Sequence, residues 1–120
     1  MMPLRIVLVE DDAVISALLA DILTECGHDV CGAAATEMEA IAAAARHAPD
    51  LMIVDAQLNR GSGVSAMQAI LLHADMPHIF MTGGSRQSIP HGAVVLQKPF
   101  GKASLLAAIE CGARRSAAPA

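Results

Sequence analysis

Short apolar runs alternate along this chain with longer segments whose apolar residues recur at helical spacing. A strand covered on both faces is apolar almost throughout, whereas a surface helix is apolar only on the side that it buries. The apolar runs therefore predict five strands, at residues 4–9, 29–33, 51–54, 78–81 and 93–96. The pattern is weaker at residues 29–33 than in the other four runs.

Four segments are predicted to be helical, at residues 13–26, 36–47, 64–74 and 102–113. Asp12 can cap the first of them, and Gly27 lies where a helix commonly stops. Thr36 and Glu39 have the spacing of a capping box at the start of the second.

Three segments need a separate interpretation. Residues 85–92 contain Ser, Pro and Gly with little apolar periodicity, so we expect the fourth helix to be short or irregular. Residues 116–120 are predicted to be a frayed tail. Gly61-Ser62-Gly63 is similar to part of a dinucleotide fingerprint, but a turn into the next helix is the better interpretation, because the run follows a long loop.

The alternation of strands and helices defines the fold class. It predicts an α/β protein with a doubly wound, five-stranded parallel sheet and right-handed crossovers. We expect residues 1–120 to form one domain, with a core in residues 4–113 and no output domain.

Composition narrows the possible functions. Apolar residues make up 54% of the chain, but only Phe80 and Phe100 are aromatic, so the core must be aliphatic. The net charge is −4, and the one obvious basic cluster is Arg114-Arg115. This charge distribution argues against nucleic-acid binding.

The cysteines and the apolar runs indicate the compartment. Cys26, Cys31 and Cys111 fit no metal-binding spacing and are expected to be reduced thiols. The longest uninterrupted apolar run, residues 40–45, is too short to cross a bilayer, and we find no signal peptide. We therefore expect a cytoplasmic protein that does not bind membranes.

Polar residues follow four of the predicted strands, at the point where each strand ends. The carboxyl ends of parallel strands meet at one edge of the sheet, where α/β proteins bind ligands. The residues concerned are Glu10, Asp11 and Asp12 after the first strand, Asp55 after the third, Thr82 after the fourth and Lys98 after the fifth. Asp12 we assign mainly to helix capping.

Carboxylates gathered in one place repel each other, so a cation or protons must compensate. Oxygen ligands of this kind favour Mg²⁺ or a similar ion. The cation and Lys98 could neutralise the oxygens of a phosphoryl group, and Thr82 could donate a hydrogen bond to it. Asp55 is the natural nucleophile, because a carboxylate can form an acyl phosphate.

This constellation resembles the receiver domain of response regulators. Glu10-Asp11, Asp55, Thr82 and Lys98-Pro99-Phe100 match the receiver pattern in order and spacing, over residues 4–111. The resemblance implies a (βα)5 flavodoxin-like fold with strand order 2-1-3-4-5. It also implies a phosphoryl donor, either a histidine kinase or a histidine phosphotransfer protein, and a downstream protein target that the sequence does not identify.

The resemblance also assigns roles to single residues. Asp55 would be the phosphoacceptor, and Thr82 and Lys98 would engage the phosphoryl oxygens. Asp11, Asp55 and the main-chain carbonyl of Gln57 would ligate Mg²⁺, with Glu10 acting through water. The Lys98–Pro99 peptide bond would be cis.

Residues 77–84 look like the Pro-Phe-x-Phe-Ala-Thr-Gly-Tyr signature of an atypical receiver subgroup from alphaproteobacteria. Pro77, Phe80, Thr82 and Gly83 match this signature. Val95, however, stands where most receivers carry a switch aromatic. We therefore expect activation to proceed through ordering of residues 83–92 rather than through an aromatic rotamer.

Two other interpretations stay open. A haloacid-dehalogenase-like phosphatase also uses an Asp nucleophile, but it prefers a second Asp where this chain has Gln57. A pseudo-receiver would be an interaction module that is never phosphorylated, although its usual sign is the loss of an acid, Asp55 or Lys98. The oligomeric state is expected to be a monomer or a weak homodimer.

Overall fold

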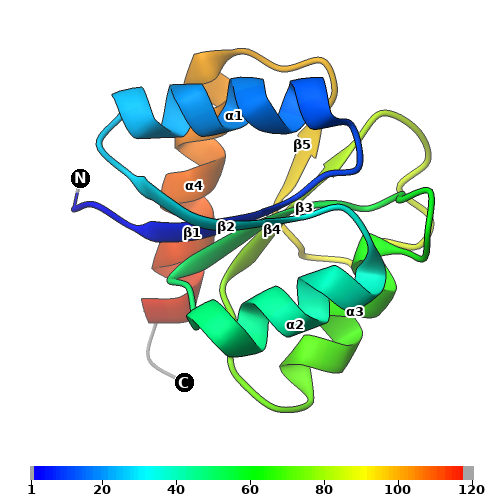
Figure 1. Ribbon diagram of the computed structural model, residues 1–120. Helices are drawn as coiled ribbons and strands as arrows, with labels where there is room; N and C mark the ends of the chain where they lie inside the picture. The colour runs from blue at the N-terminus through cyan, green and yellow to red at the C-terminus, as the bar shows by residue number, and fades with distance from the viewer. Residues whose placement is uncertain (1, 118–120) are drawn as a thin grey trace.

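The computed structural model describes residues 2–117, and the side chains of residues 2–113. Strands and helices alternate along the chain up to the fourth strand, as Figure 1 shows. The strands are β1 (Arg5–Val9), β2 (Asp29–Ala34), β3 (Leu51–Asp55), β4 (His78–Thr82) and β5 (Val95–Gln97). The helices are α1 (Ala13–Glu25), α2 (Glu37–His47), α3 (Gly63–Leu71) and α4 (Lys102–Ala117).

The five strands form one sheet in the order β2-β1-β3-β4-β5, and each neighbouring pair is parallel. The predicted doubly wound fold and its strand order are therefore confirmed. In the register of β3 and β4, Asp55 pairs with Met81, so the last residue of β3 lies beside the end of β4. The central strands β3 and β4 therefore end at the same edge of the sheet.

Two hydrophobic cores lie on opposite faces of the sheet. Along β1, Ile6 and Leu8 belong to one core, whereas Val7 and Val9 belong to the other, as the alternation of a strand requires. The first core packs against α1 and α4, and the second against α2 and α3 (Figure 1). Both cores consist largely of aliphatic side chains, with Phe80 buried in the second.

The predicted helix starts are confirmed. Asp12 Oδ1 accepts hydrogen bonds from the main-chain N–H groups of Val14 and Ile15, at 2.9 and 3.2 Å. Thr36 Oγ1 accepts from Glu39 N at 3.1 Å. The Glu39 carboxylate does not close the box on Thr36, however, and accepts from Ala35 N at 2.8 Å instead.

Two predicted helix ends are wrong. Helix α3 stops at Leu71 rather than at residue 74, because Leu72 and His73 bond to carbonyls three residues back and tighten the chain into a turn. Helix α4 continues to Ala117 rather than ending at residue 113, so Ser116 and Ala117 are helical. The rest of the predicted frayed tail lies outside the described residues.

The crossover from β4 to β5 contains turns and no helix within the described residues, which agrees with the predicted short or irregular fourth helix. Ile89 N donates to Arg86 O at 3.0 Å, and Ala93 N donates to Pro90 O at 3.2 Å. Ile89 is buried and anchors the segment in the core beside α3. The remaining side chains of residues 83–92 are exposed.

The described cysteines Cys26, Cys31 and Cys111 form no disulfide. Over residues 2–117, none of the helices is both long enough and apolar enough to pass through a bilayer.

Candidate functional site

The predicted site residues meet at the carboxyl edge of the sheet. Glu10 directly follows β1, Asp55 ends β3 and Thr82 ends β4, and all three side chains are buried. Lys98 follows β5, and its main-chain N–H donates to Thr82 O at 2.8 Å. The Lys98–Pro99 peptide bond is cis, as expected.

Lys98 forms two ion pairs in the centre of this site. Its Nζ lies 2.6 Å from Glu10 Oε1 and 2.9 Å from Asp55 Oδ2. The Lys98 side chain is 21% exposed, whereas the carboxylates of Glu10 and Asp55 are 1% and 8% exposed. One ammonium group therefore pairs with two nearly dry carboxylates and, when both are ionised, leaves one negative charge uncompensated, which costs free energy.

Glu10, Asp11 and Asp55 form an acidic cluster that could hold a metal ion. One carboxylate oxygen from each lies within 4.8 Å of those of the other two. Main-chain N–H groups orient these carboxylates: Asp12 N donates to Glu10 at 3.2 Å, and Asn59 N donates to Asp11 at 2.7 Å. A compact set of carboxylate oxygens suits a hard divalent cation such as Mg²⁺.

The charges in the cluster shift two pKa values. Burial raises the pKa of Glu10 above its ordinary value of 4.5, and the Asp55 carboxylate adds to the rise, while hydrogen bonds from Lys98 and Asp12 N only partly oppose it. Burial alone would lower the pKa of Lys98, but its hydrogen bonds to Glu10 and Asp55 outweigh burial and raise the pKa above 10.5. Lys98 therefore stays positively charged at neutral pH.

Gln57 connects three parts of the site. Its main-chain N–H donates to Asp55 Oδ1 at 3.1 Å. Its side-chain Oε1 accepts from the Thr82 hydroxyl at 3.0 Å, and its Nε2 donates to Ser85 O at 3.2 Å. The Thr82 hydroxyl also accepts from Gly84 N at 3.2 Å. The side chain of Gln57 thus joins the loop after β3 to the segment after β4.

The loop between β3 and α3 is held in place at both ends. A Cβ added to Gly63 would lie 2.0 Å from Asp55 O, so only glycine lets α3 start this close to the nucleophile candidate. Gly61 has φ +90°, which favours glycine. The Glu37 carboxylate accepts from Ser62 N and from Ser65 Oγ, both at 2.9 Å. Gly61-Ser62-Gly63 is therefore the predicted turn into α3.

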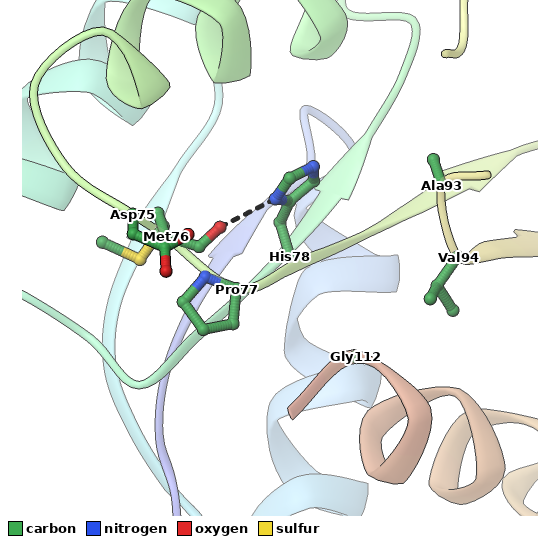
Figure 2. A pocket seen from close by; sticks show the side chains of 7 residues that line it. All are labelled: Asp75, Met76, Pro77, His78, Ala93, Val94 and Gly112. Atoms are coloured by element: carbon green, nitrogen blue, oxygen red, sulfur yellow. Dashed lines mark hydrogen bonds between the residues drawn. The ribbon is translucent and has the colours of Figure 1, made fainter. Parts of the chain in front are cut away.

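His78 lies at the opposite edge of the sheet, beside a cavity of about 180 Å³ (Figure 2). Its Nδ1 lies 2.8 Å from Met76 O, and its ring packs nearly perpendicular to the ring of Phe80, with centroids 5.2 Å apart. Because a carbonyl oxygen can only accept, Nδ1 carries the proton. These contacts account for His78 as a structural residue.

Sequence reasoning found the charged residues but missed three contacts that hold them. It predicted neither the hydrogen bond between the side chains of Gln57 and Thr82, nor the bond from Asn59 N to Asp11, nor the bonds that Glu37 accepts. Each depends on the path of the loop after β3, which a strand-and-helix pattern does not describe. The Gly61-Ser62-Gly63 run was the available signal for a tight turn there.

The fold and the site define a class of protein. Residues 6–110 match the family model for the response regulator receiver domain, which covers most of the chain. This chain therefore belongs to the response regulator receiver domain family, whose members are signalling proteins of two-component systems rather than ordinary enzymes. Membership of this family argues against the haloacid-dehalogenase-like phosphatase.

Individual relatives agree with this membership. The chain is 33% identical over 119 residues to the transcriptional regulatory protein PdtaR of Mycobacterium tuberculosis, covering 94% of this chain and 58% of the relative. It is 32% identical over 114 residues to the phyllosphere-induced regulator PhyR of Methylorubrum extorquens, covering 90% and 43%. The chain thus spans about half the length of these curated relatives.

Solved structures share the fold. The receiver domain of PhyR from Erythrobacter litoralis superposes with a TM-score of 0.88 at 30% identity, covering 98% of this chain and 95% of that one. The response regulator PhyR from Brucella abortus gives a TM-score of 0.87 at 26% identity, covering 97% and 50%.

Proposed function

We propose that Asp55 accepts a phosphoryl group from a histidine kinase or a histidine phosphotransfer protein, in a reaction that requires Mg²⁺. The observation that carries this proposal is the position of Lys98 Nζ, 2.9 Å from Asp55 and 2.6 Å from Glu10. A cation beside a buried carboxylate is placed to stabilise the charge on a phosphoryl group attached there.

In the proposed step, a carboxylate oxygen of Asp55 attacks phosphorus as the bond between phosphorus and the histidine nitrogen breaks. The electron pair of that bond stays on the imidazole, which takes up a proton, and an acyl phosphate forms on Asp55. Lys98 keeps its proton and pairs with a phosphoryl oxygen. Thr82 donates its hydroxyl hydrogen to another. The residues therefore position and neutralise charge rather than transfer protons.

Asp11, Asp55 and the main-chain carbonyl of Gln57 would hold Mg²⁺, with Glu10 acting through water. When bound, the ion supplies positive charge for the phosphoryl oxygens. Asn59 N keeps the Asp11 carboxylate turned toward the cluster, at 2.7 Å. The compact oxygen set of Glu10, Asp11 and Asp55 supports this assignment.

The output would be a contact with another protein. A PhyR relative of known structure, from Bartonella quintana, is described as an anti-anti-sigma factor. We propose that the phosphorylated domain contacts a downstream protein and acts as a cytoplasmic monomer or weak homodimer.

The test is modification by a small phosphodonor. Acetyl phosphate with Mg²⁺ should add one phosphoryl group at Asp55, detected by intact-mass spectrometry and peptide mapping, and EDTA should prevent it. Asp55→Asn should abolish the modification, whereas Asp21→Asn, at an exposed position of α1, should leave it unchanged. Equal labelling of Asp55→Asn would refute the proposal, and absence of labelling in the wild type would favour a pseudo-receiver.

A further inference from the structure

The Thr82 hydroxyl is already engaged before any phosphoryl group is present. It donates to Gln57 Oε1 at 3.0 Å and accepts from Gly84 N at 3.2 Å. Thr82 is fully buried, so its side chain has no bulk water as an alternative partner. The single hydrogen of the Thr82 hydroxyl is therefore already donated to Gln57.

A hydroxyl has a single hydrogen to donate. If Thr82 donates to a phosphoryl oxygen on Asp55, it gives up its hydrogen bond to Gln57. The two bonds thus exclude each other. The Gln57–Thr82 hydrogen bond exists only in the unmodified state. It therefore stabilises that state relative to the phosphorylated state by the free energy of the bond.

Gln57 also reaches beyond the site. Its Nε2 donates to Ser85 O at 3.2 Å, and Ser85 lies in the segment of residues 83–92 that replaces a regular fourth helix. This segment is exposed apart from the anchor at Ile89. Gln57 itself is exposed, so water can solvate its amide once Thr82 leaves it. Release of the side chain therefore has a low cost.

We propose that the Gln57 side chain is a latch that holds Thr82 and the segment after β4 in the unmodified state. Phosphorylation of Asp55 draws the Thr82 hydroxyl away, Gln57 loses its acceptor role and releases Ser85, and residues 85–88 become mobile on the surface. This inference rests on the proposed function, since it concerns the regulation of the same site. In it, Gln57 is a positioning residue that acts through Thr82.

The variant Gln57→Met tests the latch, because it keeps the length of the side chain, removes both hydrogen bonds and leaves the main-chain carbonyl in place. The matched control is Gln68→Met, at an exposed position of α3. Beryllofluoride with Mg²⁺ serves as the phosphoryl mimic. The loss of one hydrogen bond that competes with the mimic should tighten its binding roughly 2- to 10-fold in Gln57→Met, and Gln68→Met should bind it as the wild type does.

A second measurement separates the latch from a general effect on the site. In the wild type, saturating beryllofluoride should lower the ¹⁵N order parameters of residues 85–88 on the nanosecond timescale. In Gln57→Met, these order parameters should be low in the free protein and should change little when beryllofluoride is added. Because Gln68 lines the same cavity as Arg86, Gln87 and Ser88, the control for this measurement is Lys102→Met, at an exposed position of α4, which should respond as the wild type does.

Failure of the latch and failure of the proposed function give different results. If the wild type binds beryllofluoride and Gln57→Met binds it equally or more weakly, the latch is refuted and the phosphoacceptor role of Asp55 stands. Unaltered order parameters in Gln57→Met would also refute the latch. If the wild type does not bind beryllofluoride, or binds it no more tightly than Asp55→Asn does, both the latch and the phosphoacceptor role of Asp55 are refuted.

Discussion

Lys98 forms ion pairs with two buried carboxylates, so its replacement by an uncharged residue should destabilise the folded protein. In EDTA, we expect Lys98→Met to lower the free energy of unfolding by about 1–3 kcal/mol, because it leaves Glu10 and Asp55 uncompensated in a nearly dry site. The loss is smaller than for a fully buried pair, because the Lys98 side chain is partly exposed. Urea unfolding measures this difference.

Magnesium distinguishes lost charge from lost packing at Lys98. A divalent cation bound to the acidic cluster would replace the missing positive charge, so Mg²⁺ should raise the melting temperature of Lys98→Met more than that of the wild type. Lys102→Met, at an exposed position, should stay within about 0.5 kcal/mol of the wild type and respond normally to Mg²⁺. A loss in Lys98→Met that Mg²⁺ leaves unchanged would argue for packing.

At the residue scale, the positions of the charged groups could be predicted and their hydrogen bonds could not. Asp55 ends a strand, Glu10 and Lys98 each follow one, and parallel strands end at a common edge, so their meeting is a consequence of topology. The contacts of Gln57 depend instead on loop torsions that carry no periodic signal. Under the latch proposed above, the segment tethered through Ser85 would be released on activation, whereas the sequence alone led us to expect its ordering.

At the scale of elements, the start of α3 determines how closely the helix approaches Asp55. We expect Gly63→Ala to lower the free energy of unfolding by about 3 kcal/mol, at the upper end of the usual cost of overpacking, because the new methyl group would meet main-chain and not a flexible side chain. Gly84→Ala is the matched control, since a Cβ there has nothing within 4 Å. Equal unfolding midpoints in urea for the two variants would contradict this account of the loop.

The existence of the elements was easier to predict than their ends or their faces. Leu18 fits the apolar periodicity of α1 but is 57% exposed, whereas Leu19 and Leu23 are buried. A broad apolar stripe does not say which of its edges meets the sheet. The predicted end of α3 was also too late in the chain, because Leu72 and His73, which form a turn, are residue types that a helix could equally contain.

At the scale of the whole molecule, the sheet separates two aliphatic cores, with α1 and α4 on one face and α2 and α3 on the other (Figure 1). The acidic cluster lies at the carboxyl edge of the sheet. Strand order followed from membership of the family rather than from the spacing of apolar residues, since several orders satisfy the same alternation. The apolar strands nevertheless predicted coverage on both faces, and the two cores confirm it.

The acidic cluster should make the stability of the whole domain depend on pH when no divalent cation is present. The pKa of Glu10 is raised in the folded protein, chiefly by burial, above its ordinary value of 4.5. The folded state then binds more protons than the unfolded state, so the contribution of Glu10 is fully present below pH 4.5 and is lost as the pH rises through the folded pKa. Lys98, whose pKa is raised above 10.5, stays charged over this range and adds no slope.

Glu10→Gln isolates this contribution, because the amide resembles the protonated acid and does not titrate. In EDTA, the free energy of unfolding of the wild type minus that of Glu10→Gln should decrease from pH 4.5 toward neutral pH and then level off, as followed by urea unfolding at each pH. Subtracting the variant removes the titration of groups that both proteins share. A difference that stays constant would mean that Lys98 and Asp12 N stabilise the Glu10 carboxylate as much as burial and Asp55 destabilise it, and one that grows with pH would mean that they stabilise it more.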